Sequence, residues 1–254
     1  MIELQDVSFA YRADLPVLSH VDLTIKEGET VGIVGANGAG KSTLLKLLVG
    51  LVFPQEGTIL IDGETVGKKN LPVIRQKIGY VFQDSDTQLF MPTVEKDVGF
   101  APKNYGFSDE EVKRRVERAL QAVGIEDLAA RSILELSGGQ KKLASLATVL
   151  SLEPEVLLFD EPTIALDPRN RRMFIEMFPD LPGTKIIVSH DLDLVLETCK
   201  RTILISDGRI TADDDTAVIL NHKELLEENG LELPLLLQGR LRSKEGMTNE
   251  DTVH

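Results

Sequence analysis

The residues best suited to chemistry in this chain lie in three short segments, and the first has a composition typical of phosphate binding. It follows the apolar run Val31–Val34 and matches the pattern G-x-x-x-x-G-K-[ST]. Glycines let backbone N–H groups face an anion, and the helix predicted after them adds about half an elementary charge at its N-terminus. In such loops the lysine bridges the β- and γ-phosphates and the next hydroxyl binds Mg²⁺. The sequence therefore predicts a nucleotide–Mg²⁺ site made by Gly35, Ala36, Asn37, Gly38, Ala39, Gly40, Lys41, Ser42 and Thr43.

Two carboxylates end a second apolar run, Val156–Phe159. Asp160 is suited to hold Mg²⁺ through water, and Glu161 is suited to polarise an attacking water as a general base. Taken alone, an Asp-Glu pair at a strand end is about as often the start of an ordinary turn. The phosphate loop favours the catalytic interpretation, because phosphoryl transfer needs an acidic group facing the metal–phosphate complex.

A second glycine-rich helix start lies between these two segments. Ser137, Gly138, Gly139 and Gln140 open a predicted helix that runs to Ser151, and the free N–H groups of a helix start bind anions. An isolated Gly-Gly pair is usually a loop hinge. Here the pair lies too far along the chain to serve the same phosphates easily, which suggests a nucleotide held between two copies of the protein.

Together, Leu136–Gln140, the phosphate loop and Val156–Pro162 resemble the motifs of the ATP-binding-cassette (ABC) ATPases. The resemblance covers nearly the whole chain. It implies Mg²⁺-dependent ATP hydrolysis in a head-to-tail dimer, homodimeric or heterodimeric, in which Leu136–Gln140 contacts the γ-phosphate bound to the opposite subunit. We refer to Leu136–Gln140 as the signature segment.

The resemblance also implies roles for four residues that carry little weight singly. Gln83 resembles the Q-loop glutamine, which touches Mg²⁺ and water; His190 resembles the switch histidine on the γ-phosphate. Asp167 resembles the D-loop aspartate at the dimer seam, and Tyr11 the aromatic that stacks on adenine. Without the three motifs, a structural role would be the better interpretation of each residue: a surface glutamine, a strand-end histidine, a turn aspartate and a core tyrosine. The expected catalytic set is Lys41, Gln83, Glu161 and His190, and the expected Mg²⁺ set is Ser42, Gln83 and Asp160.

Two positions depart from the family pattern. Ile164-Ala165 stands where the family usually has two small residues, and Leu143 stands where many members have arginine. Neither change removes a phosphate or metal contact, so we expect activity.

The elements expected to position these residues give an α/β fold with an inserted helical region. The runs Val31–Val34, Val156–Phe159 and Ile186–Val188 are apolar throughout, as in parallel strands covered on both faces. Ligands in such sheets lie at the carboxyl ends of the strands, so the three segments should converge. Period-two alternation in residues 2–9, 21–25, 58–62 and 202–206 predicts an antiparallel lobe.

The expected organisation is an ATPase domain over residues 1–220, with a helical subdomain over about 84–152 inserted in it. Ser108–Glu111 has the sequence of a capping box at the start of one of its helices. A helical and flexible tail over 221–254 follows, with an amphipathic stretch near 231–237 and a charged end, Arg240–His254, expected to be partly mobile.

Composition restricts the possible partners. The net charge of −13 disfavours nucleic acid, since phosphate-backbone binding needs local excess of Lys and Arg. The single cysteine, Cys199, cannot form an internal disulfide, which fits a reducing compartment. No apolar stretch approaches the ~20 residues of a membrane helix, so a transport role would need another chain to form the pore.

Three segments resemble those of energy-coupling-factor and cobalt/nickel importer ATPases: Phe82–Phe90, Val98–Asn104 and Gly138–Lys142. The resemblance implies a peripheral subunit on the cytoplasmic face of the membrane, docked on an integral membrane subunit through the Q-loop region. Asp84 and Asp86 are candidates to meet basic groups there; the alternative is that they are simply solvated, as surface acids more often are. The expected cargo is cobalt or nickel, with vitamin uptake as the alternative. The chain has no His/Cys cluster of ligand spacing, so it is not expected to bind the transported ion. A soluble cassette ATPase of DNA repair or translation and a regulator without turnover are the alternatives from other classes.

Overall fold

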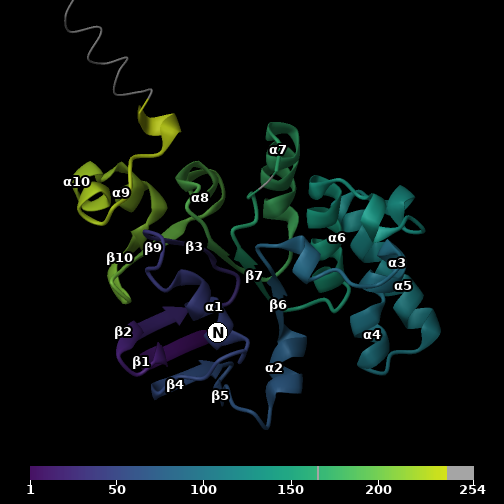
Figure 1. Ribbon diagram of the computed structural model, residues 1–254, viewed down its shortest axis with the longest axis horizontal. Helices are drawn as coiled ribbons and strands as arrows, with labels where there is room; N and C mark the ends of the chain where they lie inside the picture. Colours follow the sequence, from purple (N-terminus) through teal and green to yellow (C-terminus); the bar gives the residue numbers. More distant parts are fainter. Residues whose placement is uncertain (165, 239–254) are drawn as a thin grey trace, which may run out of the picture.

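Two β-sheets and a separate helical region make up the structure, a computed structural model that describes residues 1–164 and 166–238 (Figure 1). The smaller sheet is antiparallel, with strand order β2-β1-β4-β5. Its strands are β1 (Ile2–Arg12), β2 (Leu15–Ile25), β4 (Glu56–Ile61) and β5 (Glu64–Thr65). β1 and β2 form a long hairpin whose inward side chains are buried, as the alternating sequence predicts.

The larger sheet has the order β10-β9-β3-β8-β7-β6. Its strands are β3 (Thr30–Val34), β6 (Ile78–Val81), β7 (Val156–Asp160), β8 (Thr184–Val188), β9 (Arg201–Ser206) and β10 (Arg209–Asp215). All neighbours pair in parallel except β10, which pairs antiparallel with β9 at the edge. β7 and β8 are buried at every residue, which explains their continuous apolar sequences.

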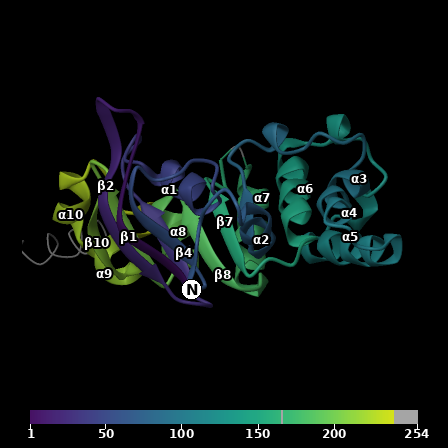
Figure 2. The ribbon, with the colours of Figure 1, turned by 90° about the horizontal axis from the view of Figure 1, so that it is seen from below.

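The helices fall into three groups. α1 (Lys41–Leu48) and α2 (Leu71–Lys77) lie near the smaller sheet. The helical arm, seen as the teal group in Figures 1 and 2, contains α3 (Val94–Val98), α4 (Phe100–Asn104), α5 (Asp109–Val123) and α6 (Gly138–Leu150). The remaining helices are α7 (Pro168–Met177), α8 (Leu192–Thr198), α9 (Thr216–Asn221) and α10 (Lys223–Glu228). Short 3-10 turns occur at Ser85–Thr87, Glu126–Leu128, Ile133–Glu135 and Phe178–Asp180.

The helical arm lies at one end of the molecule, and α9, α10 and the β1–β2 hairpin lie toward the other (Figure 2). Residues 84–152 contain helices, 3-10 turns and one isolated bridge between Thr93 and Ser132. The predicted charged end, Arg240–His254, lies outside the described residues. Within residues 1–164 and 166–238, no helix is long and apolar enough to cross a membrane.

One expectation from the sequence is wrong, and another is confirmed only in part. Residues 202–206 do not extend the antiparallel lobe: β9 pairs in parallel with β3 inside the larger sheet. Alternation reports the period of a strand but not its sheet, and four of the six β9 residues are buried. At Ser108 only half of the capping box forms. The Ser108 hydroxyl accepts the Glu111 N–H, whereas the Glu111 carboxylate pairs with Arg114 and Arg115.

α1 fixes the phosphate loop between the two sheets. Its buried leucines pack in one hydrophobic cluster with side chains of both sheets, including Leu4 of β1 and Ile33 of β3. The helix therefore has one position relative to β3, and the loop joining β3 to α1 is held at the carboxyl edge of the larger sheet.

Candidate active site

The candidate active site lies at the carboxyl ends of four adjacent parallel strands, β3, β8, β7 and β6. β3 leads into the phosphate loop, β8 into His190, β7 into Glu161 and β6 into Gln83. The convergence predicted from the apolar runs is therefore observed. Gln83 lies at the same edge of the sheet because β6, the strand before it, pairs directly with β7.

The phosphate loop curls around the Lys41 ammonium group. Lys41 Nζ donates to the carbonyl of Gly35 at 2.8 Å and to that of Ala36 at 3.0 Å. Burial lowers the pKa of Lys41, while the nearby charges of Glu161 and Asp160 act in the opposite direction. Gly40, with φ of 103°, provides the left-handed turn into α1. The loop thus presents a cation and a helix start to one cavity.

Asp160 connects the phosphate loop to the strand beside it. Its Oδ1 accepts a hydrogen bond from Ser42 Oγ at 2.8 Å, and its Oδ2 accepts one from Tyr80 Oη at 2.8 Å. Hydroxyl, carboxylate and amide oxygens are the donors that Mg²⁺ prefers. Ser42 and Asp160 are within hydrogen-bond distance, and Gln83 lines the same cavity as Ser42. The residues present therefore fit a magnesium ion.

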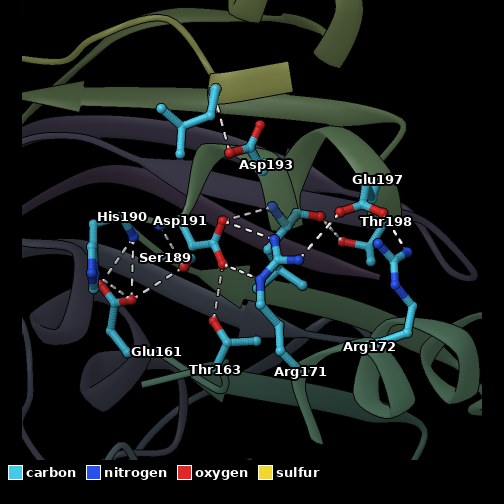
Figure 3. Close-up of polar contacts among 12 residues, drawn as sticks. Glu161, Thr163, Arg171, Arg172, Ser189, His190, Asp191, Asp193, Glu197 and Thr198 are labelled. Carbon is cyan, nitrogen blue, oxygen red and sulfur yellow. Dashed lines mark hydrogen bonds and ion pairs between the residues drawn. The ribbon is translucent and has the colours of Figure 1, made fainter. Parts of the chain in front are cut away.

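Glu161 is held in an unusual backbone conformation. Its φ of 49° lies in the left-handed region, and its N–H donates to the Val188 carbonyl of β8 at 2.8 Å. Such strain persists where the surroundings fix it, and it is common at functional sites. The carboxylate accepts hydrogen bonds from Ser189 Oγ at 3.1 Å and from the His190 N–H, and lies 2.8 Å from His190 Nδ1 (Figure 3). Glu161 and His190 therefore form one hydrogen-bonded unit.

A cavity of about 560 Å³ brings most of the predicted residues together. That volume lies within the roughly 300–1,000 Å³ of small-molecule sites. Its lining consists of Tyr11, Val17, Asn37, Gly38, Gly40, Lys41, Ser42, Thr43, Gln83, Glu161, Ile164 and His190. Ile164, noted from the sequence as a bulky departure, is thus part of the wall.

Tyr11 lies at the rim, near the tip of the β1–β2 hairpin, with 56% of its surface exposed. Its ring meets Phe9 edge-on at 4.9 Å, and its hydroxyl is 3.4 Å from Thr43 Oγ1. A core role for this tyrosine is excluded by its exposure. One aromatic face is available at the cavity mouth.

The signature segment and Asp167 do not line this cavity. They lie together elsewhere. Ser137 caps α6 in a full capping box with Gln140, and Asp167 caps α7. Asn170 links the two: it donates to Asp167 Oδ2 at 2.9 Å, and its side chain packs so closely on Gly139 that a Cβ there would lie 2.4 Å from Nδ2.

Four polar residues of the site were not singled out from the sequence. Tyr80 binds Asp160, and Arg171 binds Asp191, the residue after His190. Lys142, noted only within a family match, is buried and donates to the carbonyls of Phe82 and Gln83 at 2.9 Å. Burial lowers its pKa to about 8, against the raising effect of Asp160, Asp84 and Glu161. A tyrosine in a buried strand and a lysine on the apolar face of a predicted helix are signals that could have flagged two of them.

Comparison with known proteins identifies the family. Residues 18–164 match the family model described as "ABC transporter". A protein of Geobacter sulfurreducens named as an ABC transporter ATP-binding protein is 46% identical over 94% of this chain and 96% of its own. The energy-coupling factor transporter ATP-binding protein EcfA of Methanothermobacter thermautotrophicus is 38% identical over 100% of this chain and 86% of its own.

Solved structures agree with the sequence relatives. CbiO1 from Clostridium perfringens, described as part of the ABC transporter complex CbiONQ, has a TM-score of 0.80 at 35% identity and covers 95% of this chain and 98% of its own. The ATP-binding cassette MJ0796, solved as a dimer with ADP and Pi, has a TM-score of 0.76 at 30% identity over 85% of this chain and 99% of its own.

The chain belongs to the ABC transporter ATP-binding family. It is an ATP-binding cassette ATPase of a transporter, and the predicted fold class is confirmed. ABC ATPases dimerise and act with membrane subunits.

Proposed function

We propose that this chain is the ATP-hydrolysing subunit that energises a membrane importer from the cytoplasmic face, with cobalt or nickel ions as the cargo. The observation that carries the catalytic part is the Glu161–His190 unit facing Lys41 and Ser42 across one cavity. The importer part is supported by the likeness to CbiO1 and EcfA, together with the Q-loop segment of the sequence.

Each cavity residue has a place in this proposal. Lys41 leaves the Gly35 and Ala36 carbonyls to bind the β- and γ-phosphates, and the loop N–H groups of residues 35–43 bind their oxygens. Glu161 accepts the proton of the attacking water, and His190 orients both groups at the γ-phosphate. Tyr11 stacks on adenine at the rim.

Magnesium, when bound, neutralises charge on the phosphate oxygens. Ser42, Asp160 and Gln83 would hold it. The Ser42 hydroxyl donates to Asp160, so these two oxygens are adjacent. Gln83 is placed by the two bonds that Lys142 makes to the carbonyls of residues 82 and 83.

A second protomer completes the site in this proposal. The N-terminus of α6, at Ser137–Gln140, where Ser137 and Gly138 are exposed, binds the γ-phosphate of the partner's nucleotide, and Asp167 lies at the seam. The support is geometric: the signature segment lies outside the cavity of its own chain, and it contains the start of α6, where a helix favours a bound anion.

The helical arm presents an apolar surface next to the Q-loop. Phe90 is 63% exposed and Phe100 is 40% exposed, and their rings meet edge-on at 4.8 Å. The buried carboxylate of Asp97 accepts the N–H groups of Phe90 and Met91, which fixes this loop. We assign this pair to the docking surface for the membrane subunit. Asp86 bonds Lys141 within the chain, leaving Asp84 as the freer acid for a basic partner.

Docking is tested by co-purification with an integral membrane subunit of a CbiO- or EcfA-type transporter. Phe90→Asp should abolish co-purification and leave ATP binding unchanged, because Phe90 lies outside the nucleotide cavity. Phe107→Asp, at another aromatic on the arm, is the matched control. Complexes of the Phe90 variant that are as stable as wild type would contradict the assignment.

The vitamin alternative is favoured by the relatives named for energy-coupling factor transporters. Uptake by the reconstituted complex separates the two. Radiolabelled cobalt and nickel should accumulate in the vesicles only when ATP is supplied on the side of the membrane that carries the ATPase. Labelled vitamins should not accumulate. Accumulation of a vitamin instead would refute the metal assignment while leaving the ATPase intact.

The catalytic part is tested with Glu161→Gln, which keeps the shape of the side chain but removes the base. Turnover should fall at least tenfold, while ATP still binds. Phosphate release at saturating ATP measures the rate, and fluorescent nucleotide titration measures binding. Unchanged turnover would defeat the proposed role of Glu161.

A further inference from the structure

A path of partly buried polar contacts joins α7 to residues 189–191, the segment that carries His190. α7 begins at Pro168, directly after the D-loop residue Asp167, whose carboxylate accepts the Asn170 N–H at 2.8 Å. The Arg171 N–H donates to the Asp167 carbonyl at 2.9 Å. Arg171 therefore lies one helical turn after Asp167.

The Arg171 side chain crosses to α8. Its Nε donates to Asp191 Oδ2 at 2.8 Å and its Nη2 donates to Asp191 Oδ1 at 3.1 Å (Figure 3). A third contact reaches Glu197 at 3.4 Å. Both side chains of the main pair are only about a quarter exposed, 26% and 24%. Two parallel bonds to one carboxylate fix orientation as well as distance, unlike a single ion pair.

Asp191 is linked through Ser189 to Glu161, the proposed base. The Asp191 carboxylate also caps α8 through the Leu194 N–H at 2.9 Å. Its own N–H donates to Ser189 Oγ at 3.0 Å, and Ser189 Oγ donates to Glu161 Oε2 at 3.1 Å. His190 lies between the two residues in sequence and contacts the same Glu161 carboxylate. The guanidinium is thus two residues removed from the proposed base.

The pKa shifts of Asp191 and Arg171 favour the charged form of both side chains. Burial by itself raises the pKa of Asp191, but the hydrogen bond from Arg171 and the other donors hold that pKa below its ordinary value. The hydrogen bond from Asp191 raises the pKa of Arg171. Both groups are charged at neutral pH, and the contact does not depend on a protonation event.

We propose that Arg171 is a positioning residue for ATP hydrolysis: its two-point contact with Asp191 fixes residues 189–191 relative to the start of α7, and so places His190 and Glu161 when the D-loop moves. The link to the partner protomer rests on the proposed function, in which Asp167 lies at the dimer seam. The positioning of Glu161 within one chain does not need that part.

Arg171→Met tests the proposal, because methionine keeps an unbranched side chain but lacks the guanidinium group that contacts Asp191 at two points. Arg172→Met is the matched control: Arg172 is adjacent, pairs with Glu197 at 2.9 Å and does not contact Asp191. With the full chain, kcat for ATP should fall about tenfold in Arg171→Met, with the KM for ATP and the melting temperature close to wild type. Arg172→Met should keep the wild-type kcat.

Two further variants separate positioning from plain structural support. Arg171→Lys keeps the charge but makes one contact, so it should recover less than half of the lost kcat. Asp191→Asn combined with Arg171→Met should cost no more than the worse single change, because both remove the same contact. If Arg171→Met does not fold, Arg171→Lys alone carries the test.

Three results would overturn the proposal: a wild-type kcat in Arg171→Met, an equal loss in Arg172→Met, or a loss of kcat that merely tracks a loss of nucleotide binding and melting temperature. Glu161→Gln, measured beside these variants, keeps the two questions apart. Full turnover in Glu161→Gln refutes the proposed base. Slow turnover in that variant with a fully active Arg171→Met refutes only the positioning role.

Discussion

Asp160 shows how one residue is fixed by neighbours that its own sequence segment does not reveal. One carboxylate oxygen accepts the Ser42 hydroxyl and the other accepts the Tyr80 hydroxyl. Burial is the main reason that the pKa of Tyr80 is raised, with the Asp160 charge adding to it, so the phenol stays protonated and remains a donor. Tyr80 therefore holds the second oxygen while the first faces the proposed metal position.

Tyr80→Phe should consequently weaken the use of magnesium more than the binding of nucleotide. A hydrogen bond to a charged group contributes about 1.5–3 kcal/mol. Because 1.4 kcal/mol corresponds to tenfold in a constant, partial loss of order in Asp160 should raise the half-maximal Mg²⁺ concentration about three- to tenfold. The measurement is ATPase activity, and nucleotide affinity, across a Mg²⁺ titration.

Tyr105→Phe is the control for this change, since the Tyr105 hydroxyl makes only a 3.5 Å contact with the Pro72 carbonyl. Tyr105→Phe should leave the dependence of ATPase activity on Mg²⁺ concentration unchanged. An identical Mg²⁺ requirement in Tyr80→Phe and wild type would show that Asp160 needs no second anchor.

Sequence patterns are most informative where a motif encodes its own geometry. Glycine spacing and a strand end single out the phosphate loop and Glu161, the family resemblance adds His190, and the three line one cavity. The hydrogen-bond partners of Tyr80 and Arg171 could not be named, since they lie 80 and 20 residues away and depend on which strands and helices become neighbours. Packing across elements, rather than any local pattern, places these side chains.

At the scale of elements, the parallel strands were the easiest to predict and the edge of the sheet the hardest. β7 and β8 are apolar because both faces are covered. β9 is also nearly all buried, yet its Thr202 and its hairpin turn at Asp207-Gly208 are equally compatible with an antiparallel lobe. Its pairing with β3 depends on the path of the chain through α8, which the alternation of side chains does not encode.

The connection from β3 to α1 depends on one glycine more than on the others in its loop. Gly35 has φ of 153°, and a Cβ there would lie 2.1 Å from the Ile205 carbonyl oxygen of β9. Gly38 also has positive φ, 84°, but nothing lies within 4 Å of its Cβ position. A side chain at Gly35 would therefore meet both an unfavourable φ and a clash with the main chain of β9, which is fixed by its strand pairing.

Gly35→Ala should therefore lower the free energy of unfolding by about 2 kcal/mol or more, from strain and clash together. Gly38→Ala should lower it by about 1 kcal/mol, from strain alone. Urea unfolding without nucleotide measures both. If the two variants were equally stable, the close approach of the loop to β9 would not be present in solution.

At the scale of the whole molecule, charge works against the association that the proposed mechanism requires. Each chain carries a net charge of −13, and a bound nucleotide adds further negative charge. Two copies can close on their nucleotides only if the phosphates are neutralised locally. In the proposed dimer the Lys41 ammonium and the helix starts of α1 and α6 would supply that compensation.

Dimerisation should thus depend on ATP and on Lys41. In a Glu161→Gln background, where slow hydrolysis preserves the nucleotide, ATP should convert the protein to dimers, as light scattering after size exclusion would show. Adding Lys41→Ala should leave it monomeric, because an uncompensated γ-phosphate would then meet the partner's signature segment. Lys46→Ala, a lysine of the same helix that lies outside the cavity, should still permit the dimer. Dimers that form without ATP and persist in the Lys41 variant would mean that the two chains associate through some surface other than the nucleotide.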